Sequence, residues 1–105
     1  MNHQYAQGLA MLEEAVLALT AEGEQRKRLL HVYFIWLAGM PLHLLPPRLR
    51  PAMVDIKMHF CCEEVGDIRN QSEATLRQLR RKLVKLYGEM SAWVALEQNR
   101  SEREA

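Results

Sequence analysis

The residues of this sequence best suited to chemistry are Asp55, His59 and Glu63, which recur at intervals of four, with Cys62 beside them. An interval of four places side chains on one face of a helix, and carboxylate, imidazole and thiolate groups are ligands for zinc or iron. Many helices with a polar face carry the same residue types, however, and metal sites in bundles usually take ligands from several helices. We therefore expect no metal and no cofactor, and the sequence leaves open whether these residues bind a ligand.

A second candidate site pairs Arg26 with His31, which are separated by four residues. This spacing resembles the RNA-cleaving motif of HEPN-type helical toxins, and Lys27 loosely matches the polar residue that follows the arginine in that motif. The resemblance covers six residues and implies a ribonuclease site on a bundle helix at a dimer interface. A histidine on an apolar helix is more often a buried residue with one hydrogen bond than a general base, so the enzyme is the alternative function.

A third candidate is a basic helix face on which Arg77, Arg81 and Lys85 recur at intervals of four. Such a face can contact phosphates, which makes these residues the candidate nucleic-acid contacts. More often it is the solvated side of a helix, and the sequence has no recognition-helix turn, glycine-rich phosphate loop or interleaved aromatic residues. The net charge of +1 also lacks the basic excess typical of nucleic-acid binding. A nucleic-acid-binding regulator is therefore a further, less favoured alternative.

The elements that must position these residues follow from turn chemistry. A chain of 105 residues, of which 49% are hydrophobic, fits one domain with a small core. Turn-forming residues cluster around Gly23, in 39–51 and in 66–72, and three breaks predict four helices. We expect an all-α, single-domain four-helix bundle over residues 1–98, followed by a flexible tail over residues 99–105.

The first two predicted helices differ in the width of their apolar surface. Residues 2–22 are amphipathic, with one apolar stripe formed by Tyr5, Leu9, Leu12, Val16 and Leu19. Residues 24–38 are apolar on every side except at His31, so this helix should be the central element of the bundle. Gly39 and Pro41 should end it. Because prolines also interrupt the apolar residues that follow, we expect no membrane span.

The third predicted helix, residues 51–65, carries two apolar stripes. One stripe consists of Met53, Ile56 and Phe60, and the other of Val54, Met58, Cys61 and Val65. Two stripes predict two neighbours. The first neighbour is the core of the same chain, and the second is either another helix of the bundle or a second subunit.

The fourth predicted helix, residues 71–98, has the most regular pattern. Its seam alternates spacings of three and four through Leu76, Leu79, Leu83, Leu86, Met90 and Trp93. At roughly 40 Å it is longer than the two helices before it, which reach only about 23 Å. We expect its excess length to pack on a second copy of the chain. The predicted homodimer interface therefore contains Met90, Trp93 and Leu96, together with Met58 and Cys61, and could cover part of the apolar segment 29–45.

The sequence favours an interaction protein over an enzyme. The first residues do not resemble a secretory signal, and the adjacent Cys61 and Cys62 are poorly placed to pair with each other, which predicts reduced thiols in the cytoplasm. The most concentrated feature is apolar helix surface suited to another helix. We therefore predict a small cytoplasmic helical interaction protein without catalysis, an adaptor, chaperone or regulator. Its partners would be a second copy of the chain and an unidentified protein.

Overall fold

The computed structural model describes the backbone of residues 3–20, 23–61 and 71–104, and side chains within residues 4–20, 23–60 and 71–99. The described residues form four α-helices and no strand, which confirms the all-α class. The helices are α1 (His3–Leu19), α2 (Gln25–Val32), α3 (Arg50–Cys61) and α4 (Glu73–Glu104). A π-helical turn, η1 (Tyr33–Leu37), continues α2, and two 3₁₀ turns, η2 (Leu42–Leu44) and η3 (Pro47–Leu49), lead into α3.

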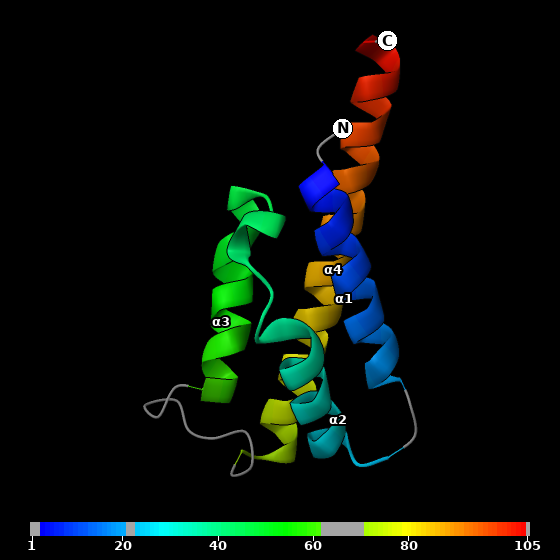
Figure 1. Ribbon diagram of the computed structural model, residues 1–105. Helices are drawn as coiled ribbons and strands as arrows, with labels where there is room; N and C mark the ends of the chain where they lie inside the picture. Colours follow the sequence, from blue (N-terminus) through cyan, green and yellow to red (C-terminus); the bar gives the residue numbers. More distant parts are fainter. Residues whose placement is uncertain (1–2, 21–22, 62–70, 105) are drawn as a thin grey trace.

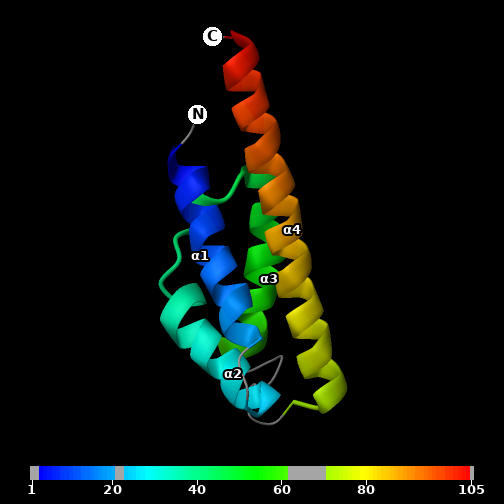
Figure 2. The ribbon, with the colours of Figure 1, turned by 90° about the vertical axis from the view of Figure 1, so that its right-hand side faces the viewer.

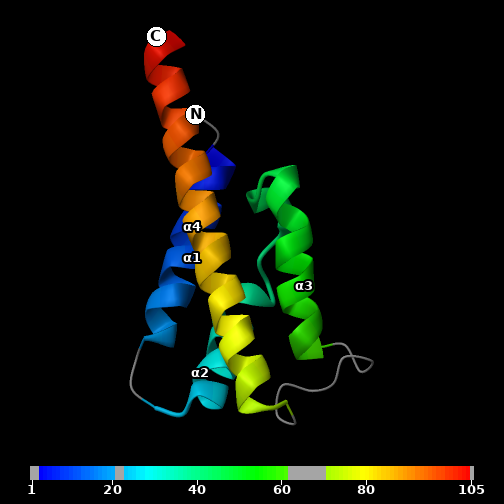
Figure 3. The ribbon, with the colours of Figure 1, turned by 180° about the vertical axis from the view of Figure 1, so that it is seen from behind.

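Helix α4 is the longest element, and it contacts each of the other three α-helices. Helices α1 and α3 run along it (Figures 1 and 3), whereas η1 lies on the opposite side of the molecule from α4 (Figure 2). The C-terminal end of α4 extends beyond every other described element (Figure 1). It ends at Glu104 rather than near Gln98, so the segment expected to be a flexible tail, 99–105, has helical backbone up to Glu104. That segment contains neither glycine nor proline, and its arginines and glutamates favour helix.

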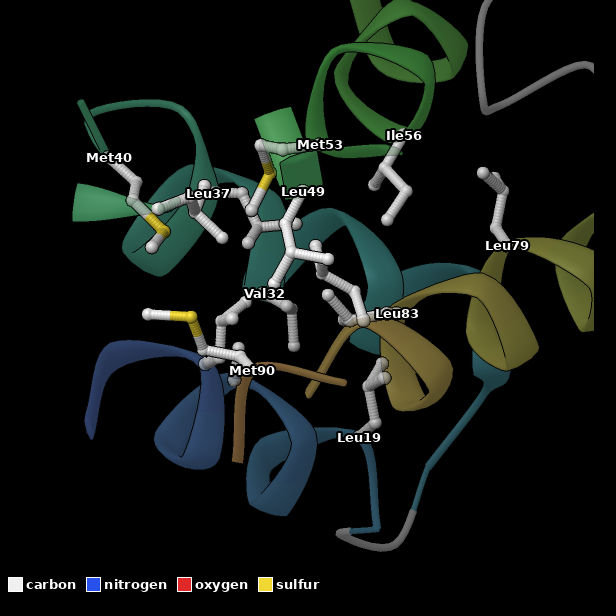
Figure 4. Packing of buried hydrophobic residues seen from close by; sticks show 14 of the residues in the cluster. Leu19, Val32, Leu37, Met40, Leu49, Met53, Ile56, Leu79, Leu83 and Met90 are labelled. Atoms are coloured by element: carbon white, nitrogen blue, oxygen red, sulfur yellow. The ribbon is translucent and has the colours of Figure 1, made fainter. Parts of the chain in front are cut away.

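One hydrophobic core joins the helices, and Figure 4 shows side chains of α1, α2, η1, η3, α3 and α4 pointing into this shared interior. Helix α4 contributes Leu76, Leu79, Leu83, Leu86, Met90 and Val94. The seam in the sequence predicted these positions through Met90, but the next core residue is Val94 instead of Trp93. Met90 is fully buried inside the single chain, so it has no surface to offer to the partner subunit for which it was predicted.

The prediction that residues 24–38 form the central element of the bundle is wrong. In this segment Leu29, Val32 and Leu37 are buried, whereas Phe34 is 69% exposed and Ile35 is 58% exposed. Helix α2 and η1 contact α1, α3 and α4 on one side, and no described element covers the side chains on the other. The apolar residues of this segment therefore form a surface as well as a core. None of the described helices combines the length and the apolar composition needed to cross a bilayer.

The two apolar stripes of α3 have different surroundings. Met53 and Ile56 of the first stripe are buried in the core of the chain. Val54 and Met58 of the second stripe are 39% and 45% exposed, so this stripe does not pack on the described part of the same chain. The remainder of that stripe, from Cys61 onward, lies outside the described side chains.

Two cations of α3 hold the connection that precedes this helix. Arg50 Nε donates hydrogen bonds to the carbonyl oxygens of Leu42 and Leu45, at 3.1 and 3.0 Å. Lys57 Nζ donates to the carbonyl oxygen of Met40 at 2.7 Å. Hydrogen bonds from charged donors are stronger than neutral ones, so these contacts fix the segment 40–45, which includes η2, relative to α3.

Candidate interaction surface

The π-helical turn changes which side chains of residues 33–37 enter the core. The Ala38 N–H donates to the Tyr33 carbonyl oxygen at 2.7 Å, a step of five residues that inserts one residue into the helical register. An uninterrupted α-helix would repeat the buried position of Val32 at Trp36. In the structure Leu37 is buried instead, and Trp36 is only partly buried. Single π-helical turns are rare in proteins, and those that occur are often found at functional sites.

Three aromatic rings, each in contact with the next, extend from the core to the surface at this turn. Tyr33 stacks on Phe60 of α3, with ring centroids 4.5 Å apart and an interplanar angle of 5°. Phe34 meets Tyr33 edge to face, with centroids 5.4 Å apart and an angle of 69°. Phe60 is 9% exposed and Phe34 is 69% exposed, so a buried ring supports an exposed one. The exposed Phe34 ring therefore contacts a ring that is itself packed on the core.

The exposed apolar side chains of η1 and α3 lie on neighbouring elements. Phe34 and Ile35 belong to η1, which contacts α3. On α3, Lys57 points toward the connection that follows η1, since it binds the Met40 carbonyl, and Val54 lies roughly 60° from Lys57 around the helix axis. Met58 lies one helical turn after Val54. We refer to Phe34, Ile35, Val54 and Met58 as the η1–α3 surface.

The interface predicted at the end of α4 is divided between core and surface. Met90 is buried, Trp93 is partly buried, and Leu96 is 63% exposed. The indole Nε1 of Trp93 is buried and has no hydrogen-bond partner among the described residues. Trp93 and Leu96 line a hollow together with Arg48 and Leu49 of η3. Exposed apolar surface at this end is therefore smaller than the sequence suggested.

The polar face of α3 binds α4 through an ion pair. Asp55 Oδ2 accepts a hydrogen bond from Lys82 Nζ at 2.8 Å, and Asp55 Oδ1 lies 4.0 Å from His59 Nε2. The Lys82 hydrogen bond lowers the pKa of Asp55 below its ordinary value. No cluster of three or more metal-capable side chains occurs within the described residues, and Cys62 and Glu63 lie outside them.

Arg26 and His31 do not share an environment. Arg26 Nη2 donates to the Gln71 carbonyl oxygen at 2.6 Å and lies 3.7 Å from Glu73 Oε1, so the guanidinium connects the start of α2 to the start of α4. His31 is exposed. A separation of five positions turns the two side chains roughly 140° apart around the helix axis. Arg26 therefore takes part in a contact between α2 and the start of α4, and His31 does not take part in that contact.

The predicted nucleic-acid contacts Arg77, Arg81 and Lys85 all lie exposed on α4. Together with Arg80 and Val84 they line one shallow hollow on the outer face of this helix. The spacing in the sequence thus identified side chains that do share a face.

The chain matches no protein-family model, no curated protein and no solved structure. No relative therefore supplies a function for any of these surfaces. Reasoning from the sequence did not single out Phe34 and Ile35, although the signal was present, because a helix that is apolar all round needs more cover than a small bundle provides. The π-helical turn that orients them has no counterpart in the periodicity of the sequence.

Proposed function

We propose that the protein is a non-catalytic helical interaction protein that forms a homodimer through the η1–α3 surface. The observation that supports this proposal is the exposure of Phe34 and Ile35, at 69% and 58%, on a turn whose neighbouring rings are already packed. Large exposed apolar side chains gathered on adjacent elements are typical of binding sites. Phenylalanine and methionine are also enriched in interfaces, and Met58 was expected there from the sequence.

A second copy of the chain is the partner that these residues favour. No described segment covers Phe34 or Ile35, so in water they need a partner that is always present. A second copy meets this requirement, and a two-fold axis would bring Phe34 against the same residue or its neighbours in the other subunit. An apolar side chain can pack against the same residue of a second subunit, because this contact requires no group of opposite charge. The cytoplasmic location and the role as adaptor, chaperone or regulator are part of the same proposal.

The end of α4 is the less favoured interface. Met90 has no exposed surface and Trp93 is partly covered by the chain itself, which leaves Leu96 as the main exposed apolar side chain there. A single exposed leucine is ordinary on a protein surface. The ribonuclease alternative gains no support, because the Arg26 guanidinium is bound to Gln71 and Glu73.

The test is the molar mass in solution, measured by light scattering over a range of protein concentrations. We expect the wild type to be a dimer and the variant Phe34→Ser/Ile35→Ser to be a folded monomer by circular dichroism. The matched control is Leu17→Ser/Leu96→Ser, which removes two side chains that are 56% and 63% exposed on α1 and α4. The control should remain a dimer. A monomeric wild type, or equal dissociation of both variants, would contradict the proposal.

A further inference from the structure

Five basic side chains form a surface at the N-terminal half of α4 and the adjoining start of α2. They are Arg28, Arg77, Arg80, Arg81 and Lys85, and we call them the basic surface. Lys85 lies 4.0 Å from Glu89, and its side chain is 79% exposed, which makes this pair weak. The side chains of the four arginines have no ion pair or hydrogen bond with any described residue.

Other cations of the chain are used to hold the fold. Arg26 binds Gln71, Arg50 binds Leu42 and Leu45, and Lys82 binds Asp55, as described above. The basic surface differs because its arginine side chains make no such contact with the described residues. Their positive charge is therefore available to a ligand.

Side chains from two helices converge at this surface. The hollow on α4 is lined by Arg77, Arg80, Arg81 and Lys85 around Val84. A second hollow, between the end of α1, the start of α2 and α4, is lined by Arg28 and Arg80. Arg80 belongs to both, and neither hollow has an acidic residue among the lining side chains that the structure describes. Guanidinium groups that face one space repel each other, and a bound anion removes this repulsion.

Positive charge is concentrated in this part of the chain. The chain as a whole carries a net charge of only +1, yet residues 77–85 contain five basic residues and no acidic one. A single-sign patch of this density attracts polyanions by steering them to one face. The low net charge of the whole chain hides this feature from an analysis of composition.

We propose that the basic surface binds the phosphate backbone of a nucleic-acid duplex without reading its sequence. Phosphates are the ligands that arginines bind best, through paired hydrogen bonds. Recognition of single strands relies on bases stacked on aromatic rings, and neither hollow has an aromatic residue among its described lining side chains. A duplex presents its phosphates outward and needs no such rings. This proposal rests on residues that do not belong to the η1–α3 surface, and η1 lies on the opposite side of the molecule from α4 (Figure 2).

The test uses the whole chain and a fluorescently labelled DNA duplex of mixed sequence, with binding followed by anisotropy at low and at physiological salt. We expect a dissociation constant on the order of 1–100 μM at physiological salt, and tighter binding at low salt. The variant Arg77→Glu/Arg81→Glu should weaken binding at least tenfold and reduce the salt dependence by roughly two phosphate contacts. Arg77→Gln/Arg81→Gln, which adds no acidic group to α4, should weaken binding in the same direction and keep the helical circular dichroism.

The matched control is Lys27→Glu/Arg48→Glu, which makes the same change in net charge at two exposed cations outside the basic surface. This control should bind the duplex nearly as well as the wild type. Three results would overturn the proposal: no binding at low salt, an equal loss in the control, or tighter binding to a single strand of the same length. Binding to vesicles that contain phosphatidylserine, without binding to the duplex, would assign the surface to a membrane and overturn it as well.

Discussion

Gly8 of α1 lies directly against the backbone carbonyl of Leu44 in η2, with no room for a side chain between them. A Cβ atom at position 8 would overlap this carbonyl oxygen, and backbone can yield less than the end of a side chain. We therefore expect Gly8→Ala to lower the free energy of unfolding by about 1–3 kcal/mol, measured by urea denaturation.

Gly88→Ala on α4 is the matched substitution for this prediction. Apart from the backbone of α4 itself, no described residue lies within 4 Å of the Cβ that it would add, and the position is inside a helix. Because alanine loses less backbone entropy than glycine on folding, we expect a gain of about 0.5–1 kcal/mol. If Gly8→Ala and Gly88→Ala changed the free energy of unfolding by urea equally, the close approach of α1 to η2 would not restrict the side chain at position 8.

The ion pair between Asp55 and Lys82 predicts a pH-dependent contribution to stability. Lys82 holds the pKa of Asp55 below 3.8, so the contribution is complete above that pH and is lost as the pH falls through the lower value in the folded state. We expect Lys82→Gln to cost about 0.2–1 kcal/mol at pH 7, because the pair is partly exposed. The difference from the wild type should shrink in urea titrations repeated at pH 3. Lys85→Gln is the control and should change stability little at either pH.

Arg26 and His31 should differ in their effect on stability. Removing the Arg26 guanidinium leaves the Gln71 carbonyl without its charged donor, so Arg26→Ala should cost about 1–3 kcal/mol. His31 is exposed, and His31→Ala should stay within about 0.5 kcal/mol of the wild type. Urea denaturation measures both. A labelled RNA that the wild type cleaves and that neither variant cleaves would instead support the ribonuclease alternative.

The stack of Tyr33 on Phe60 should influence both stability and self-association. Phe60→Leu removes the ring that supports Tyr33 and, through it, Phe34, and should cost about 1–3 kcal/mol. If the η1–α3 surface forms the dimer, the dimer dissociation constant should also rise. Leu12→Val, a core change on α1, should lower stability without this rise. Sedimentation equilibrium together with urea denaturation separates the two effects.

The buried face of α4 could be predicted from the sequence, because apolar residues spaced alternately three and four positions apart lie on one side of a helix. Leu76 through Met90 are buried where the seam places them. The end of the helix could not be predicted in the same way. Residues 99–104 contain no breaker, but polar residues with good helix propensity give no periodic signal, so their helical backbone in the structure was not foreseen.

The environment of the second helix could not be predicted, for a different reason. Its apolar composition indicates how much surface needs cover, but not which neighbours exist to provide it. The π-helical turn then moved the buried position from Trp36 to Leu37, and periodicity at 3.6 residues does not anticipate such an insertion.

The candidate sites were predictable to different degrees. Arg77, Arg81 and Lys85 could be placed on one face because they share a helix and a fixed spacing. The contact of Arg26 with Gln71 could not, because it joins residues 45 positions apart through tertiary packing. The lysine partner of Asp55 also comes from another helix, which spacing within α3 does not show.

The reliance of the core on α4 has a consequence for the synthesis of the protein. Helices α1, α2 and α3 leave the ribosome first, and each later packs on α4. At about 5–20 residues per second, translation of the 32 residues of α4 takes about 2–6 s. During this time the core leucines of the nascent chain lack their largest neighbour. The core can therefore close only after α4 has emerged from the ribosome.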